Sequence, residues 1–159
     1  MLFMNQTKTF KPLNPKWYLI DCNNLIVGRL SCFVACLLRG KNKSNFAPFW
    51  NLGDHVILIN SQKVIFSKDK EIKKKYYHHS LYPGGLKVKT AQELRSKFPN
   101  RIIQFAVKGM MPKNKLSAKQ LKNLHIFSDD VHTFKAQKPL KLNLDFKLTN
   151  PIVSVQNEK

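Results

Sequence analysis

A run of apolar residues that continues almost unbroken from His55 to Asn60 constrains the fold of this chain more than any other feature. A continuous apolar run of this length is typical of a central strand that is covered on both faces. A second short run, from Trp17 to Cys22, also has the pattern of a buried strand. Apolar residues at helical spacing lie between the two runs, namely Ile26, Leu30, Phe33 and Leu37, and Gly40 follows them. A strand, a helix and a strand at this spacing predict a right-handed parallel βαβ unit.

Shorter elements are predicted along the rest of the chain. They are residues 64–66 as an extension of the sheet, 83–85 as a turn, 90–97 as a helix opened by a Thr90–Glu93 capping box, 99–111 as a second helix, a third short helix capped by Ser117, and 125–127 as a last short strand. The second helix should turn Ile102, Ile103, Ala106, Val107 and Met110 toward the core. A length of 159 residues fits one domain, with residues 1–15 as an N-terminal extension, 16–130 as an α/β domain and 131–159 as a tail.

The balance of charge is the second strong constraint. Twenty-eight Lys and Arg residues against nine Asp and Glu residues give a formal net charge of +19, which calls for a polyanionic partner. Nucleic acid is the default partner, and an anionic membrane surface is the alternative. The cations form three runs, residues 39–43, 68–75 and 94–128, and the last run contains eight cations and no acid. Three such runs favour contact with phosphate over a solvated surface.

Other classes of protein are disfavoured. The longest apolar stretch, residues 30–38, is too short to span a bilayer, and residues 1–16 lack the pattern of a secretory signal. Three cysteines without metal-type spacing predict neither a disulfide nor a metal site, and they favour a reducing compartment. The helix after the first strand has only two arginines, which argues against a membrane-surface protein. A nucleotide-dependent RNA-modifying enzyme is a further alternative, but no phosphate-binding glycine pattern follows Asp21 and no Ser–His or Cys–His pair has recognisable spacing.

Three motifs suit contact with RNA. Residues 76–79, Tyr-Tyr-His-His, offer ring faces for stacking on bases, and lysines 73–75 precede them. Because side chains alternate along a strand, we expect at most half of them to face RNA and the others to pack inward, and a zinc site from adjacent histidines is disfavoured. The Pro-Gly-Gly turn at 83–85 should bring backbone N–H groups close to phosphate. Residues 108–115 are a helix end and a cationic loop, whose two methionines should fill the core.

Several segments, taken in order, resemble the ribosomal protein L13 family. The matching segments are residues 17–21, Val27-Gly28-Arg29-Leu30, Leu38-Arg39-Gly40-Lys41, residues 53–57, 60–64, 76–79 and 82–87, and above all residues 106–114, AVKGMMPKN. The resemblance covers about residues 16–127. It implies a three-layer α/β/α domain around a mostly parallel sheet. The residues themselves add the basic loops and an extended C-terminal tail, and the resemblance does not cover that tail. The resemblance also implies a structural protein that binds large-subunit ribosomal RNA, supports early subunit assembly and translation, and has no catalytic activity or cofactor.

The expected RNA-binding residues come from the helix at 27–39, the cationic runs and the motifs. They are Arg29, Arg39, Lys41, Lys43, Lys73, Lys74, Lys75, Tyr76, Tyr77, His78, His79, Gly84, Gly85, Lys87, Lys89, Lys108, Lys113, Asn114, Lys115, Lys119 and Lys122. The expected partners are large-subunit ribosomal RNA and neighbouring large-subunit ribosomal proteins, with no membrane, small-molecule substrate or metal ion. Lysine outnumbers arginine by 24 to 4, a bias typical of A/T-rich codons, which favours a mitochondrial ribosome over a plastid or bacterial one.

The tail after residue 130 has a mixed composition. Its last part has few, scattered apolar residues, namely Phe146, Leu148, Ile152 and Val153. Pro151 prevents a continuous helix there. We therefore expect an extended tail that is ordered only by docking on a neighbouring ribosomal protein or RNA surface. The alternative is that the tail packs back on its own domain as an added strand.

Overall fold

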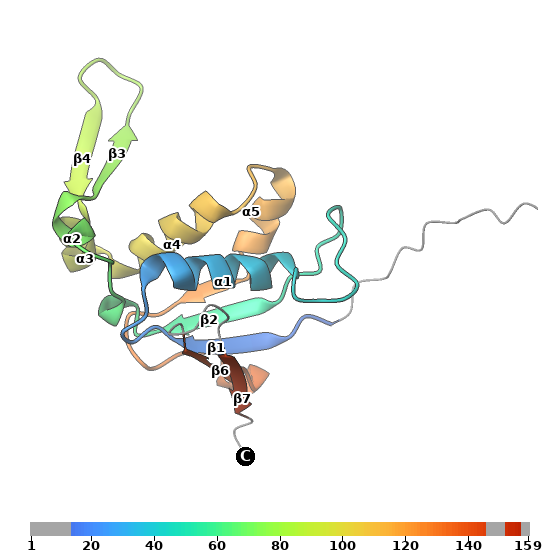
Figure 1. The fold of residues 1–159 in the computed structure, drawn as a ribbon. Coiled ribbons are helices and arrows are strands. Elements are labelled where there is room, and N and C mark those ends of the chain that lie inside the picture. The colour runs from blue at the N-terminus through green and yellow to red at the C-terminus, as the bar shows by residue number, and fades with distance from the viewer. Residues whose placement is uncertain (1–13, 146–151, 157–159) are drawn as a thin grey trace, which may run out of the picture.

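The computed structural model describes residues 14–145 and 152–156, and a five-stranded sheet lies at its centre (Figure 1). The strands lie in the order β5-β2-β1-β6-β7. The first four are parallel, and β7 runs antiparallel to β6. Their bounds are β1 Trp17–Asp21, β2 His55–Ile59, β5 Leu124–Ile126, β6 Leu140–Asp145 and β7 Ile152–Gln156. The α/β class with a mostly parallel central sheet is therefore confirmed.

The predicted βαβ unit forms the middle of the sheet. β1 pairs in parallel with β2, with Trp17 beside His55 and Asp21 beside Ile59. Helix α1, Val27–Arg39, connects the two strands and ends at Gly40. The φ of Gly40 is 72°, a left-handed conformation that glycine adopts without strain. The apolar periodicity of this region therefore predicted the two strands, the helix and its end correctly.

Three helices pack on one face of the sheet, namely α1, α4 and α5 (Figure 1). The helices after α1 are α2 Lys70–Lys73, α3 Ala91–Lys97, α4 Pro99–Met110 and α5 Lys115–Leu121. The capping box of α3 is confirmed, because Thr90 Oγ1 accepts the Glu93 N–H and Glu93 Oε2 accepts the Thr90 N–H. The cap of α5 differs from the prediction. Asn114 Oδ1 accepts the Ser117 N–H at 2.7 Å, and Ser117 itself is buried in the first turn.

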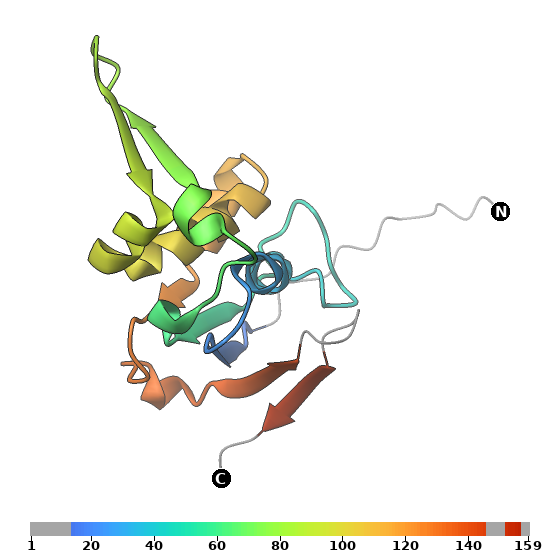
Figure 2. The ribbon, with the colours of Figure 1, turned by 60° about the vertical axis from the view of Figure 1, so that its left-hand side comes forward.

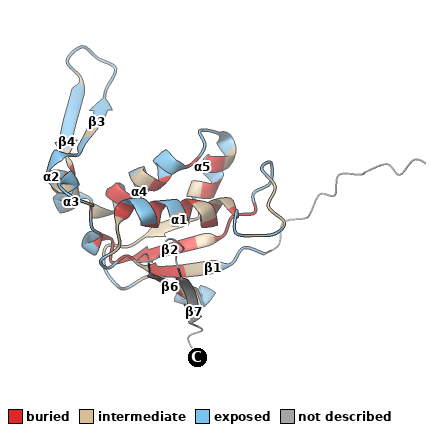
Figure 3. Ribbon diagram, viewed as in Figure 1, coloured by how far each residue is buried: buried red, intermediate tan, exposed pale blue. Residues whose placement is uncertain are grey.

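Alternation along the central strands divides the core into two clusters. Ile20, Val56 and Leu58 face the helices. Leu19, Ile57 and Ile59 face the opposite side, where Phe127 and Phe134 pack against them. The segment 127–139, which contains the 3-10 turn η2 (Lys135–Gln137), therefore covers this second face. The two covering layers are unequal, with α-helices on one face and an irregular segment on the other, and the buried residues lie in the central strands and along the helices, above all α1 (Figure 3).

An aromatic cluster closes the second face of the sheet. The rings of Trp17 and His55 stack with centroids 4.0 Å apart, and His125 lies 4.4 Å from Phe134. Burial lowers the pKa of His55, although the nearby Asp54 carboxylate opposes this shift. Burial also lowers the pKa of His125, and the neighbouring His55 adds to the effect. The cluster therefore favours two neutral imidazoles.

The free energy of unfolding should fall as the pH decreases. The folded-state pKa of both histidines lies below the ordinary value of 6.5, so below that pH the unfolded chain binds more protons than the folded one. The stabilising contribution of the neutral pair is complete above about pH 6.5 and is lost as the pH falls through the folded pKa values. Denaturant unfolding measured above and below about pH 6.5 should show that acidification lowers the free energy of unfolding less for His125→Gln than for the parent protein. His78→Gln, on an exposed strand, should behave as the parent does, and an identical response of both variants would contradict the role of the cluster.

The C-terminal segment belongs to the domain, so the expectation of a separate extended tail is wrong for the residues that the structure describes. β6 pairs in parallel with β1, where Ile20 lies beside Leu142, and β7 continues the sheet beyond β6. Leu142 and Leu144 are buried in the helix-side core. The physical reason is the open edge of β1, which an alternating apolar strand can pair with and cover. Residues 1–13, 146–151 and 157–159, with the expected anchors Phe146 and Leu148, lie outside the described residues.

Two smaller predictions are also corrected. Residues 64–66 add no strand to the central sheet, because Ile65 makes only an isolated bridge with Ile26. Met110, in the last turn of α4, is 43% exposed, whereas Met111 is buried. Helix α4 ends at Met110. Met111, directly after the helix, therefore fills the core, although helical periodicity predicts Met110 there.

A two-stranded hairpin projects from the helical layer. It consists of β3, Lys75–His79, and β4, Leu86–Thr90, which pair in antiparallel fashion apart from the central sheet. Figures 1 and 2 show the hairpin extending well beyond the body of the domain. The hairpin follows α2 and leads directly into α3. Its base is therefore attached to the domain, and its tip extends away from it.

Candidate nucleic-acid interface

The two faces of the β3–β4 hairpin carry different side chains. Residues directly opposite each other in an antiparallel pair share a face. One face carries Tyr76 and His78 from β3 with Lys89 and Lys87 from β4. The other face carries Tyr77 and His79 with Val88 and Leu86, and its one cation, Lys75, lies at the base of the hairpin opposite Thr90. The register therefore gives the hairpin one cationic face, which suits phosphate, and one apolar and aromatic face, which suits stacking.

Both faces of the hairpin are open to solvent. Of residues 76–79, only Tyr76 is half-buried, and its ring centroid lies 5.9 Å from that of Phe105 on α4. Tyr77 is 66% exposed, and both histidines are exposed. The expectation that alternate side chains pack inward is therefore wrong beyond Tyr76. The reason is that a projecting two-stranded ribbon has no layer on either side (Figure 3).

Arg95 of α3 fixes the base of the hairpin to the domain. Its Nε and Nη2 donate to the Glu71 carboxylate of α2 at 2.6 and 2.8 Å. Its Nη1 donates to the backbone carbonyls of Gln62 and Val64. Burial at this base raises the pKa of the Tyr76 hydroxyl, and Glu71 adds to the shift while Arg95 opposes it. Because an isolated two-stranded hairpin is marginally stable, these contacts at its base set its orientation.

The tip of the hairpin is a tight turn, as predicted for residues 83–85. Gly84 has a φ of 71°, and the Gly85 N–H donates to the Tyr82 carbonyl at 2.9 Å. A Cβ on Gly85 would lie 2.1 Å from Ser80 Oγ, so this position needs space. Leu81 also has a positive φ, 70°, and is 90% exposed. A bulky side chain in that conformation is held outward at the tip of the hairpin.

The lysines before and within β3 remain on the surface. Lys73 Nζ lies 3.0 Å from Asp69 Oδ2, but both side chains are largely exposed, so this ion pair is weak. Lys74 Nζ lies 5.3 Å from the centre of the Tyr76 ring, and Lys75 is exposed. All three expected contacts of this run therefore present accessible ammonium groups.

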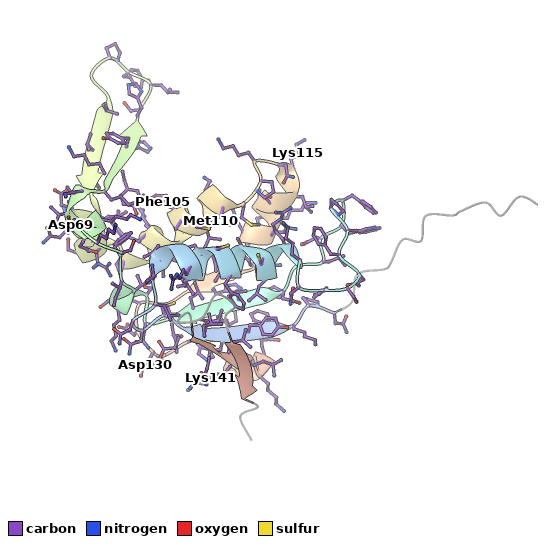
Figure 4. The ribbon with its side chains drawn as sticks, in the orientation of Figure 1. Asp69, Phe105, Met110, Lys115, Asp130 and Lys141 are labelled. Carbon is purple, nitrogen blue, oxygen red and sulfur yellow. The ribbon has the colours of Figure 1, made fainter. Side chains whose placement is uncertain are left out.

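A second basic surface follows the end of α4 and α5. Its exposed lysines are Lys108, Lys113, Lys115, Lys119 and Lys122. Figure 4 shows Lys115 at the outer end of the loop between the two helices. No Asp or Glu occurs between residues 94 and 128, so these charges have no acid within their own segment. Asn114 is exposed as well, although its side-chain oxygen already caps α5.

The first cationic run divides between surface and interior. Arg29 and Lys41 are exposed, and Arg39 is half-buried. Lys43 is only partly exposed, and its Nζ lies 2.6 Å from Oδ1 of Asp54, a residue with no exposed surface. An ammonium that neutralises a buried carboxylate cannot leave it for phosphate without a large cost. Lys43 is therefore less available to phosphate than the other cations of this run.

Cys22 and Asp21, at the end of β1, have structural contacts. Burial, with Asp21 nearby, raises the pKa of Cys22 to about 12, so its thiol stays protonated and is a poor nucleophile. Asp21 Oδ1 accepts from the Asn23 N–H and from Asn60 Nδ2. Among the described residues, no three His, Cys, Asp or Glu side chains are grouped as metal ligands would be. The same residues include no helix that is long and apolar enough to cross a bilayer.

Several exposed apolar side chains beside these surfaces escaped the sequence analysis. On the hairpin they are Leu81, Tyr82, Leu86 and Val88. Phe105 and Met110 of α4 are also exposed, and they line a cleft between α4, α2 and the start of α1 (Figure 4). The position of Leu81 and Tyr82 directly before the Pro-Gly-Gly turn was a usable signal for the tip. No sequence signal reports the exposure of Phe105, because it depends on the angle of the hairpin.

Comparison with known proteins gives a consistent result. Residues 15–133 match the family described as Ribosomal protein L13. The chain is 50% identical over 131 residues to the large ribosomal subunit protein uL13 of Mycoplasmopsis agalactiae, which covers 82% of this chain and 91% of that protein. It is 48% identical over 138 residues to the uL13 of Geobacillus kaustophilus, which covers 86% of this chain and 95% of that protein. These two relatives are bacterial, so they lend no support to a mitochondrial location. The matched range and the extent of identity show that the chain belongs to the ribosomal protein L13 family.

Proposed function

We propose that this protein is a structural constituent of the large ribosomal subunit, where it binds large-subunit ribosomal RNA and holds converging RNA segments during assembly. The observation that carries the proposal is the projecting hairpin, whose two open faces differ in chemistry and whose base is fixed by Arg95. A net charge of +19 and relatives that are named as large-subunit proteins support the same conclusion.

The two basic surfaces would act mainly on phosphates. Lysines on the cationic hairpin face and around α5 neutralise the RNA backbone and release condensed counterions. On the other hairpin face, the rings of Tyr77 and His79 offer stacking surfaces to unpaired bases. At the tip, phosphate would approach the Gly84 N–H, because Pro83 has no N–H and the Gly85 N–H donates to the Tyr82 carbonyl.

The protein partners and the compartment are also part of this proposal. Neighbouring large-subunit proteins would pack on exposed apolar parts of the surface that RNA leaves uncovered. The bacterial relatives favour a bacterial ribosome over the mitochondrial one that codon bias suggested. None of these roles requires a catalytic group or a bound small molecule.

Sedimentation tests the proposal. The tagged protein should travel with large subunits through a gradient at moderate salt. A Tyr77→Ala/Tyr82→Ala variant should melt at the same temperature, because both side chains are mostly exposed, yet shift to the unbound fraction. Val131→Ala removes a similarly exposed apolar side chain from the segment that covers the opposite face of the sheet, and it should sediment as the parent does. A parent protein that stays at the top of the gradient would contradict the proposed function.

A further inference from the structure

The loop between α1 and β2, residues 41–53, displays two large aromatic side chains, and we call it the aromatic loop. Phe49 is 64% exposed and Trp50 is 40% exposed. Their ring centroids lie 6.1 Å apart, with the planes inclined at 51°. The loop lies at the end of the domain opposite the hairpin (Figures 1 and 2), so it is separate from the surface that carries the proposed function. Adjacent exposed rings of this size indicate a contact surface.

Buried contacts hold the aromatic loop in one conformation. The ammonium of Lys43 crosses its interior, where it donates to Asp54 Oδ1 at 2.6 Å and to the Leu52 carbonyl at 2.8 Å. Asp54 Oδ1 also accepts the Lys16 N–H at 2.9 Å, which ties the loop to the start of β1. The Leu52 side chain is buried, and the Trp50 N–H closes a turn within the loop. The two rings are therefore preorganised for a partner.

The charges around the aromatic loop favour RNA as that partner. The only acid between residues 40 and 54 is Asp54, which is fully buried and paired with Lys43. Lys41, in the aromatic loop, and Lys16, directly before β1, are both exposed. Arg39 is half-buried where the loop begins. The basic helix α5 lies over the C-terminal half of α1, from which the loop departs (Figure 1). Exposed rings can stack on unpaired bases, and nearby cations can bind the adjoining phosphates. The loop exposes no acid that would repel those phosphates, so its side chains suit an unpaired RNA segment.

We propose that the aromatic loop binds an unpaired RNA segment, with a base stacked on Trp50 or Phe49 and Lys41 near the adjoining phosphate. This inference rests on the proposed binding of ribosomal RNA, and it adds a second contact at the far end of the domain from the hairpin. A rigid domain that holds RNA at both ends fixes the relative orientation of two RNA segments, which a single contact cannot do.

Affinity measurements provide the first test, with deproteinised large-subunit RNA of Geobacillus kaustophilus as the probe. Trp50→Ala should weaken binding about 5- to 150-fold, the range found when one stacking ring is removed, and Trp50→Phe should restore most of the loss. Because a ring contacts no phosphate, Trp50→Ala should leave the salt dependence unchanged, whereas Lys41→Gln should lower its slope by about one. Ile65→Ala, a comparably exposed apolar residue outside the loop, is the matched control.

Tryptophan fluorescence provides the second test, because the chain has only two tryptophans. In Trp17→Phe, the emission comes from Trp50 alone, and Trp50→Ala gives the signal of Trp17 alone. Stacking of a base should quench Trp50 and protect it from acrylamide when the RNA is added, while Trp17 in its cluster should not respond.

The outcomes separate this inference from the proposed function. If the parent protein does not bind the RNA, the proposed function fails and takes the inference with it. If the parent binds but Trp50 stays accessible and Trp50→Ala binds equally well, only the inference is overturned. Protection of Trp50 in complete large subunits but not by the RNA alone would also overturn it, because the partner would then be a ribosomal protein.

Discussion

Binding to large-subunit ribosomal RNA should weaken steeply as the salt concentration rises. The exposed lysines of the hairpin and of α5 are numerous enough for about 6–10 phosphate contacts, and each contact releases condensed counterion. By analogy with duplex DNA, the affinity should fall roughly a thousandfold or more between about 50 and about 200 mM salt. Filter binding or fluorescence anisotropy across this range measures the effect. A nearly flat response would contradict the electrostatic account.

A pair of charge-matched variants shows whether the contacts lie where the structure suggests. Lys113→Gln/Lys115→Gln, between α4 and α5, should reduce the slope of log affinity against log salt by about two. Lys135→Gln/Lys138→Gln removes the same charge from η2, on the opposite face of the sheet. That variant should keep the slope of the parent protein. Equal losses in both variants would mean that the RNA surrounds the domain or that only net charge matters.

Gly53→Ala should be among the most destabilising single substitutions in this protein. A Cβ at Gly53 would lie 1.9 Å from the backbone oxygen of Leu38, at the point where the chain enters β2 beneath the end of α1. Neither backbone can yield without separating the helix from the strand and disturbing the buried ion pair of Lys43 and Asp54 next to it. We expect a loss of more than about 3 kcal/mol, at the upper end of the range for overpacked sites.

Gly109→Ala provides the control for this substitution. Gly109 lies near the end of α4, and a Cβ there would meet no atom within 4 Å. Because alanine is the better helix former, this variant should be neutral or up to about 1 kcal/mol more stable. Denaturant unfolding compares the two variants directly. If Gly53→Ala proved as stable as Gly109→Ala, the close packing of α1 against the start of β2 would be wrong.

Local patterns were sufficient for the centre of the fold. The apolar run of β2 and the helical spacing before it predicted a parallel βαβ unit, and the Thr90–Glu93 pair predicted the start of α3. Both patterns involve residues that are close together in the chain. Each depends on one kind of interaction, which is apolar burial for the βαβ unit and hydrogen bonding for the capping box. Such local patterns were not sufficient for β6, whose three leucines alternate with polar residues but lie far along the chain from β1. A single alternating segment does not show which strand will accept it as a neighbour.

The candidate interface was predicted in part for the same reason. Clusters of lysine and aromatic residues can be recognised in the sequence, so residues 73–79, the 83–85 turn and residues 108–115 were selected. The pairing of β3 with β4 into a hairpin and the surroundings of each side chain were not predicted. Lys43 and Lys41 are two residues apart in one basic run, yet the first is held by a buried carboxylate and the second is exposed. Asp54, which makes the difference, lies eleven residues further on.

The sequence by itself determined the charge, the central βαβ unit and membership of a ribosomal family, because composition, periodicity and ordered motifs do not depend on distant contacts. Only the tertiary structure decided which face of the hairpin is cationic, which lysine pairs with a buried carboxylate and where the C-terminal strand pairs. Those properties follow from register and from neighbours that are remote in the chain. A shift of one residue in the β3–β4 register would move Lys87 and Lys89 onto the face of Tyr77 and His79, and the clustering of lysine and aromatic residues does not set that alignment.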